Sequence, residues 1–127
     1  MTLPRRGAVA ALDIGSHTAG LTVARRMGER LVVDHDALRF TRLGEGLEIG
    51  GALGQGAIQR TVEAVADLLA TDAIQGVSSI VAAITSPGRR ARNMDCLVDA
   101  LVALGCAAQV ISGEEEAKLT WEGVFTI

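Results

Sequence analysis

Hydrophobic and polar positions along the chain predict five strands and three helices. Apolar or alternating runs predict strands over residues 7–13, 20–26, 30–40, 77–85 and 107–112. The first three runs follow one another through short polar turns, and Gly28 is the expected pivot of one of them. Three consecutive strands joined in this way are typical of an antiparallel meander.

Apolar residues recur at helical spacing in the second half of the chain. A glycine-rich loop over residues 44–56 precedes a helix whose apolar stripe is Ile58, Val62, Val65 and Leu69. The opposite face of this helix is polar and carries Arg60, Glu63 and Asp67. Residues 91–104 predict a second helix that Gly105 ends, and a third helix starts after Ser112.

The predicted order of elements is β-β-β-α-β-α-β-α, and 127 residues fit a single domain. Strands that alternate with helices are typical of parallel strands with crossover helices. Together with the meander, this order predicts an α/β fold around a mixed five-stranded sheet.

Composition narrows the classes of partner. The chain contains only two Phe and one Trp, and its net charge is −3. Faces for base stacking and a general basic field are both missing, so we expect no nucleic-acid partner. No apolar run reaches membrane-spanning length, and we expect no membrane partner. Cys96 and Cys106 form no CxxC pair and are interpreted as buried thiols, which favours a cytoplasmic location.

The first candidate site follows the first predicted strand, in the sequence from Asp13 to Thr18. The backbone amides of a small polar turn can hold phosphate oxygens, and Ser16 and Thr18 add hydroxyl donors. Asp13, at the end of the strand, could hold Mg²⁺ through water. An ordinary hairpin turn, with Asp13 accepting turn amides, explains the same residues.

The second candidate site follows the fourth predicted strand. Thr85 ends that strand, Pro87-Gly88 fit a type II turn, and Arg89, Arg90 and Arg92 come next. Guanidinium groups bind phosphate in a fork geometry, and an anion would explain cations at a helix N-terminus, where the dipole opposes them. The alternative is a solvated basic start to a helix.

The third candidate site is the start of the last helix. Ser112 and Glu115 have the spacing of a capping box, and the helix dipole favours acidic residues in the first turn. Capping does not require Glu116. Because α/β folds place ligands at the carboxyl ends of parallel strands, a carboxylate here could orient an attacking water.

These segments together resemble the N-terminal lobe of the exopolyphosphatase/guanosine pentaphosphate phosphohydrolase (Ppx/GppA) family. That family belongs to the actin-like ATPase superfamily, with a ribonuclease H-like fold. Four segments carry the similarity in the family's order: ALDIGSHTAGLTVAR, RLGEGLEIGGALGQGAIQRTVEAV, AAITSPGRRARN and VISGEEEAKLTWEGV. Single segments of this kind are weak signals, and four in order are a strong one.

The resemblance implies roles for individual residues. Glu116 falls on the carboxylate that activates water, and Arg89 on the arginine that faces the substrate phosphates. A divalent metal, Mg²⁺, is expected at Asp13 and Glu116. With the candidates above, the expected phosphate-binding set is Asp13, Gly15, Ser16, His17, Thr18, Thr85 and Ser86.

The sequence departs from the family at three places near these residues. His17 stands where the family usually has Asn, and Gly20 stands where it has Arg or Lys. Pro87-Gly88 replace an Ala-hydrophobic pair before Arg89. The loss of a cation at residue 20 weakens the phosphate-binding pattern locally.

The implied function is hydrolysis of terminal phosphoanhydride bonds of inorganic polyphosphate, or of the 5′-phosphate of guanosine pentaphosphate. The family's second phosphate loop is not found in residues 1–127, so we expect this chain to be one lobe of a longer, homodimeric protein and inactive alone. One alternative is an actin-like module that binds a nucleotide or alarmone without turnover. Another is an actin-like kinase, which would place its base differently from Glu116.

Overall fold

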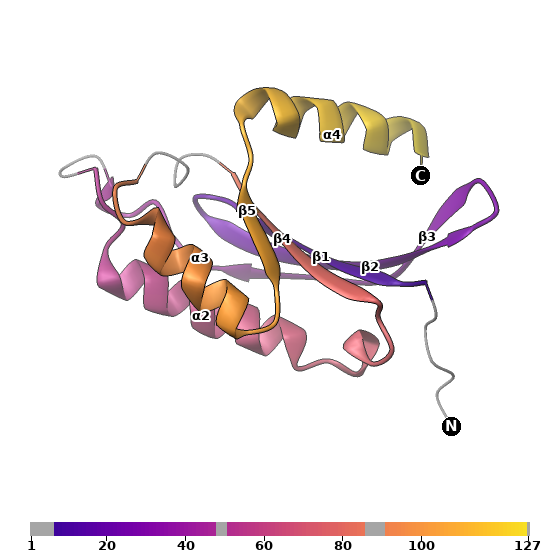
Figure 1. The fold of residues 1–127 in the computed structure, drawn as a ribbon, viewed down its shortest axis with the longest axis horizontal. Coiled ribbons are helices and arrows are strands. Elements are labelled where there is room, and N and C mark those ends of the chain that lie inside the picture. The colour runs from indigo at the N-terminus through magenta and orange to yellow at the C-terminus, as the bar shows by residue number, and fades with distance from the viewer. Residues whose placement is uncertain (1–6, 48–50, 86–90, 127) are drawn as a thin grey trace.

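A computed structural model of the chain describes residues 7–47, 51–85 and 91–126 (Figure 1). It contains a five-stranded sheet in the order β3-β2-β1-β4-β5. The strands are β1 (Val9–Ile14), β2 (Thr18–Met27), β3 (Arg30–Phe40), β4 (Ser79–Ile84) and β5 (Ala107–Val110). The helices are α2 (Gln55–Leu69), α3 (Met94–Ala103) and α4 (Gly113–Thr126), with a short 3₁₀ turn over Asp72–Ile74.

The pairing of the strands confirms the predicted mixed sheet. Strands β1, β2 and β3 form an antiparallel meander, whereas β4 runs parallel to both β1 and β5. Helices α2 and α3 cover one face of the sheet, and α4 lies on the opposite side (Figure 1). The carboxyl ends of the parallel strands β1, β4 and β5 therefore meet at one edge of the sheet.

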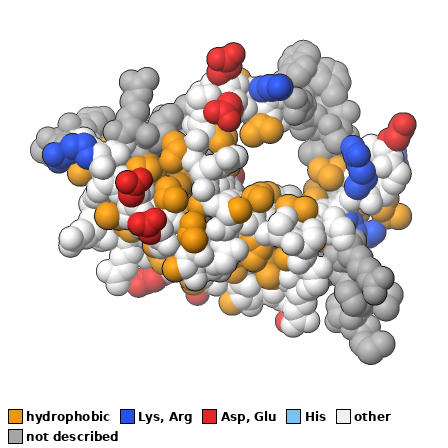
Figure 2. All heavy atoms as spheres, in the orientation of Figure 1, with side chains coloured by type: hydrophobic (Ala, Val, Ile, Leu, Met, Phe, Trp, Pro, Cys, Tyr) orange, Lys and Arg blue, Asp and Glu red, His pale blue; other side chains and the backbone are white. Residues whose placement is uncertain are grey.

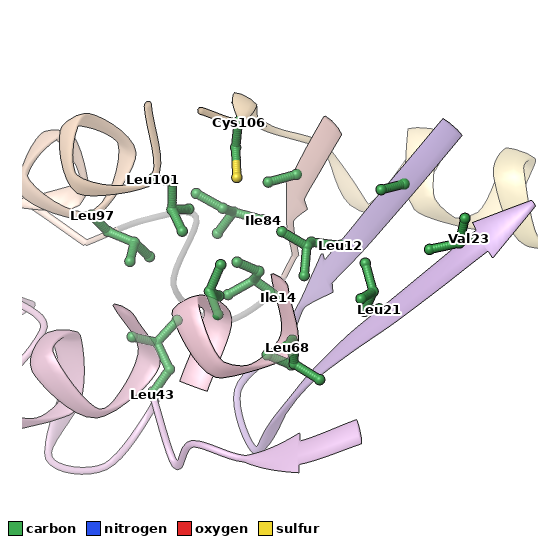
Figure 3. Packing of buried hydrophobic residues seen from close by; sticks show 14 of the residues in the cluster. Leu12, Ile14, Leu21, Val23, Leu43, Leu68, Ile84, Leu97, Leu101 and Cys106 are labelled. Carbon is green, nitrogen blue, oxygen red and sulfur yellow. The ribbon is translucent and has the colours of Figure 1, made fainter. Parts of the chain in front are cut away.

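The core lies between the sheet and the pair α2 and α3. Along β1 the side chains of Ala10, Leu12 and Ile14 are buried, while Ala11 and Asp13 alternate with them on the other, more open face. Figure 3 shows Leu12, Ile14 and Ile84 meeting Leu97 and Leu101 in this layer. Within the described ranges every buried hydrophobic side chain is aliphatic or a sulfur-containing Met or Cys, as the scarcity of aromatic residues predicts.

The buried face of α2 differs from the predicted stripe. The fully buried residues are Ala57, Thr61, Val65 and Leu68, and Ile58, Val62 and Leu69 are only partly buried at the side of the core. Small side chains, Ala57 and Thr61, therefore occupy two of the buried positions of this helix. The Thr61 hydroxyl is satisfied inside the helix because it donates to the Ala57 carbonyl at 2.8 Å.

The end of the fifth strand and the exposure of one cysteine also differ from the prediction. The fifth strand stops at Val110 rather than at residue 112, because Ser112 already caps α4. Cys106 is buried as predicted, but Cys96 is exposed on α3, so half of that prediction was wrong. Gly105, with φ of 94°, ends α3 as predicted. No helix in the described part of the chain is long and apolar enough to cross a membrane.

Candidate active site

A cavity of about 460 Å³ lies between the sheet and α4, on the face that α2 and α3 leave open. Figure 2 shows the molecule hollowed below α4. The polar side chains that line the cavity come from β1, β2, β3, the end of β4 and α4, and are Asp13, Thr22, Asp36, Thr85 and Glu116. Three of these five residues, Asp13, Thr85 and Glu116, are predicted site residues, so the fold brings three separate candidate segments to one place.

Small neighbours give the Asp13 side chain its access to the cavity. In the sheet register Asp13 pairs with Gly20 on β2 and with Ala83 on β4. Neither neighbour carries a side chain larger than a methyl group on the face that Asp13 shares. The carboxylate at the end of β1 therefore stands in an open strip of the sheet surface.

Glu116 reaches the cavity from the first turn of α4. The predicted capping box is present: the Glu115 amide donates to Ser112 Oγ at 3.0 Å, and the Ser112 amide donates to Glu115 Oε1 at 3.1 Å. The box uses Ser112 and Glu115, so capping does not account for Glu116, which lines the cavity instead. The helix start thus sets the position of a carboxylate at the carboxyl end of β5.

The charge of Glu116 acts on the carboxyl group of Asp13. Burial raises the pKa of Asp13 above its ordinary value, and the negative charge of Glu116 raises that pKa further. A cation between them would relieve this repulsion. Mg²⁺ commonly uses one or two carboxylates and fills its other positions with water and phosphate oxygens, so Asp13 and Glu116 fit this ion. Among the described residues, no group of three or more His, Cys, Asp or Glu side chains could hold a metal.

Thr85 links β4 to β1 at the edge of the cavity. Both its amide and its hydroxyl donate to the Ile14 carbonyl, at 2.9 and 3.3 Å. The hydroxyl is therefore already used in holding the two strand ends together. The two other predicted residues of this segment, Ser86 and Arg89, lie outside the described residues, as do Pro87 and Gly88.

The turn from Gly15 to Thr18 lies beside the cavity and does not line it. The Gly15 amide donates to the Thr18 carbonyl at 3.0 Å, which closes the turn between β1 and β2. A Cβ atom at Gly15 would stand 3.7 Å from Thr85 Oγ1, so the turn adjoins the Thr85 side of the site. His17 is exposed, and Ser16 and Thr18 are partly buried.

Two polar residues of the cavity were missed in the sequence. Thr22 and Asp36 face each other across β2 and β3, and Thr22 Oγ1 lies 3.5 Å from Asp36 Oδ1. They share the face of Asp13 because Gly20, the register partner of Asp13, lies two residues before Thr22. Alternation along β2 could have identified Thr22, but Asp36 depends on a strand register that the sequence does not show.

Comparison with known proteins identifies a family. The Ppx/GppA phosphatase family model matches residues 22–127. The structure of the Aquifex aeolicus member of that family has a TM-score of 0.74 and 28% identity over 86% of this chain and 36% of its own. An exopolyphosphatase-like protein has a TM-score of 0.81 and 27% identity, covering 88% of this chain and 34% of its own.

A third solved structure adds to the likeness of fold. An exopolyphosphatase from Cytophaga hutchinsonii has a TM-score of 0.74 and 24% identity, covering 88% of this chain and 36% of its own. The chain thus spans about a third of the length of these relatives. Because the family model covers most of the sequence, including the segment of Glu116, the chain belongs to the Ppx/GppA phosphatase family and has its actin-like ATPase-type fold.

Proposed function

We propose that the chain forms one lobe of a phosphohydrolase that cleaves terminal phosphoanhydride bonds of inorganic polyphosphate, or the 5′-phosphate of guanosine pentaphosphate. The observation that carries this proposal is the pair of carboxylates, Asp13 and Glu116, at one cavity. Asp13 comes from the end of β1 and Glu116 from the start of α4, which follows β5; α/β folds bind their ligands at this edge of the sheet. The phosphatase family of the chain supports the same reaction class.

In the proposed reaction, water attacks the terminal phosphate in line with the bond that breaks, and the residues of the site have separate roles. Glu116 orients the water and accepts its proton as the new P–O bond forms. The phosphoanhydride bond opposite the water breaks, and the shortened phosphate chain leaves with the bridging oxygen and its electron pair. The backbone amides of the turn after β1 donate to oxygens of the phosphate chain. Asp13 and Glu116 would hold Mg²⁺, which when bound offsets the negative charge of the phosphates.

The two-lobe arrangement is part of the proposal. Its support is that the matched part of this chain covers only 36% and 34% of two solved relatives. A second lobe over the open side of the cavity would exclude bulk water from the reacting phosphate. The homodimeric state of the whole protein and its cytoplasmic location stay predictions.

Replacing Glu116 in the complete protein tests the proposal. Glu116→Gln keeps the size of the side chain and removes the base, so we expect kcat for phosphate release to fall by about 100-fold or more. Glu114→Gln is the matched control, because Glu114 is exposed in the same turn of α4 and does not line the cavity. Full activity of the Glu116→Gln variant would refute the assignment of the base.

A further inference from the structure

The turn after β1 is held in place by the segment that follows β3. The Gly44 amide donates to the Ser16 carbonyl at 3.0 Å, and the amides of Thr41 and Arg42 both donate to the His17 carbonyl, at 2.8 and 3.1 Å. We call residues 41–44 the bracket. It fixes two peptide groups of a turn that lies far away in the sequence.

The bracket decides which way an amide of this turn faces. A trans peptide unit directs its carbonyl and its amide to opposite sides. The peptide unit between Ser16 and His17 has its carbonyl on the bracket, so the His17 amide points away from the bracket. In the described part of the chain no backbone carbonyl accepts from this amide. Its direction is thus set by the bracket, at a turn that lies beside the cavity.

Arg60 of α2 holds the bracket from the other side. Its Nε donates to the Thr41 carbonyl at 3.1 Å, and its Nη2 donates to the Arg42 carbonyl at 3.3 Å and to the Glu45 carboxylate at 3.1 Å. Thr41 is fully buried, so its carbonyl needs a donor inside the protein. The sequence pattern predicted Arg60 on a polar outer face, whereas the structure turns it onto the bracket.

The contacts form a continuous line from α2 to the turn. The peptide unit between Thr41 and Arg42 accepts from Arg60 through its carbonyl and donates to His17 through its amide. A guanidinium charge at one end polarises such a chain of hydrogen bonds and strengthens each of them. Arg60 therefore acts on the turn without touching it.

The backbone of the bracket is also constrained. Arg42 has a φ of 52°, in a region that residues other than glycine rarely adopt. In this conformation its amide joins that of Thr41 on the same carbonyl of His17. A residue keeps such a conformation only where its surroundings fix it, and Arg60 supplies contacts on both sides of this residue.

We propose that Arg60 is a positioning residue for the phosphate-binding turn, an inference that rests on the function proposed above. It holds the bracket so that the His17 amide faces the phosphate chain of the substrate. Loss of Arg60 leaves the buried Thr41 carbonyl without its donor, and the turn loses its fixed orientation. The effect on catalysis is indirect and comes from misplaced phosphates.

The experiment compares Arg60→Met, Arg60→Lys and Arg25→Met in the complete protein. Arg25 is a matched control: its side chain is 37% exposed, as is that of Arg60, and it also pairs with a carboxylate, that of Asp34. It lies near the other end of β2, where it is paired in register with Val32 and bonds to Asp34. Hydrogen exchange of residues 41–44 reports on the bracket, and steady-state kinetics with polyphosphate or guanosine pentaphosphate reports on the turn.

We expect Arg60→Met to speed exchange in the bracket by about fivefold or more. It should lower kcat/KM by about tenfold or more, mainly through KM, because a small misplacement of bound groups is costly. Arg60→Lys should bring both the exchange rate of the bracket and kcat/KM part of the way back to the original values, because an ammonium group can still donate to the Thr41 carbonyl. Arg25→Met should stay within about twofold of the original protein, as expected for a half-exposed ion pair.

Unchanged exchange in Arg60→Met, or a kcat/KM equal to that of Arg25→Met, would overturn the positioning role. If the original protein releases no phosphate from either substrate, the proposed function fails separately. Calorimetric binding of inorganic tripolyphosphate then decides about Arg60. Weaker binding by Arg60→Met than by Arg25→Met supports the role, and equal binding refutes it.

Discussion

Asp13 is a carboxylate in an unfavourable place for a charge. It follows a buried apolar strand, stands between Gly20 and Ala83 in the sheet, and shares a cavity with Glu116. Burial and the neighbouring charge both raise its pKa. A carboxylate kept in such a place costs stability, which is typical of a residue retained for binding rather than for folding.

Asp13→Asn should stabilise the metal-free protein at neutral pH. Because the folded pKa of Asp13 is raised, its ionised form opposes folding, and that cost is lifted as the pH falls through the raised pKa. Thermal unfolding at pH 7 should show a higher Tm for Asp13→Asn than for the original protein. Mg²⁺ should raise the Tm of the original protein and leave that of the variant unchanged, because binding to the folded state stabilises it. An equal Mg²⁺ response in both would contradict the metal assignment.

The two thiols should differ in reactivity. Cys96 is exposed, whereas Cys106 is buried and its pKa is raised by that burial. At pH 8 in the native protein, alkylation should modify Cys96 at least about tenfold faster than Cys106, since the thiolate is the reactive form and needs access. Mass spectrometry of the two peptides measures both rates. Equal rates would mean that the region around α3 and β5 is packed differently.

At the scale of elements, the Asn93 side chain at the start of α3 binds the loop that precedes α2. Asn93 Oδ1 accepts from the Leu53 amide at 2.7 Å, and its Nδ2 donates to the Leu53 carbonyl at 2.8 Å. The Arg92 amide donates to the Gly51 carbonyl at 2.7 Å next to this pair. The start of α3 is thereby fixed to the loop before α2, which explains why Asn93 forms no side-chain cap for its own helix.

Asn93→Ala should lower the free energy of unfolding by about 1–3 kcal/mol, because two backbone groups of Leu53 lose their partner. Asn93→Asp should cost more, since a carboxylate cannot donate to the Leu53 carbonyl. Gln59→Ala is a suitable control, because Gln59 makes one exposed hydrogen bond to Glu63, and we expect a change within about 0.5 kcal/mol. Urea unfolding measures all three variants, and an Asn93→Asp protein as stable as the original would disprove this account.

Local patterns predicted most elements, and tertiary contacts decided the rest. The antiparallel meander and the capping box of Ser112 and Glu115 follow from spacing within a few residues, so the sequence shows them directly. The buried face of α2 includes the small residues Ala57 and Thr61, and the apolar spacing did not select them. The roles of Arg60 and Asn93 depend on segments far away in the chain, which one sequence cannot pair.

The candidate site also combines residues that local patterns predict with residues that only the tertiary structure brings in. Glu116 could be chosen from the sequence because the capping box does not require it. Asp13 was a candidate beside the alternative of an ordinary hairpin turn, and the family resemblance gave both residues their expected roles. Asp36 could not be chosen, since its place in the cavity follows from the register between β2 and β3. Arg89 and Ser86 lie outside the described residues, and their roles stay predictions.

At the scale of the whole molecule, the sheet has two unlike faces. One is sealed by α2 and α3 over an aliphatic core (Figure 3), and the other carries the cavity and exposes apolar side chains such as Leu38 and Phe40 on β3. Leu38 and Phe40 pair in register with Gly20 and Thr18, next to the turn between β1 and β2. The open face therefore fits one wall of an active site, which agrees with the two-lobe proposal.

The measurement that tests the central claim most directly is phosphate release by the complete protein with Mg²⁺. Long-chain polyphosphate and guanosine pentaphosphate are offered in parallel, and residues 1–127 alone serve as the control. We predict release from at least one substrate by the complete protein and none by residues 1–127. Release by residues 1–127 would contradict the need for a second lobe, and silence of the complete protein on both substrates would contradict the phosphohydrolase and favour a module that binds without turnover.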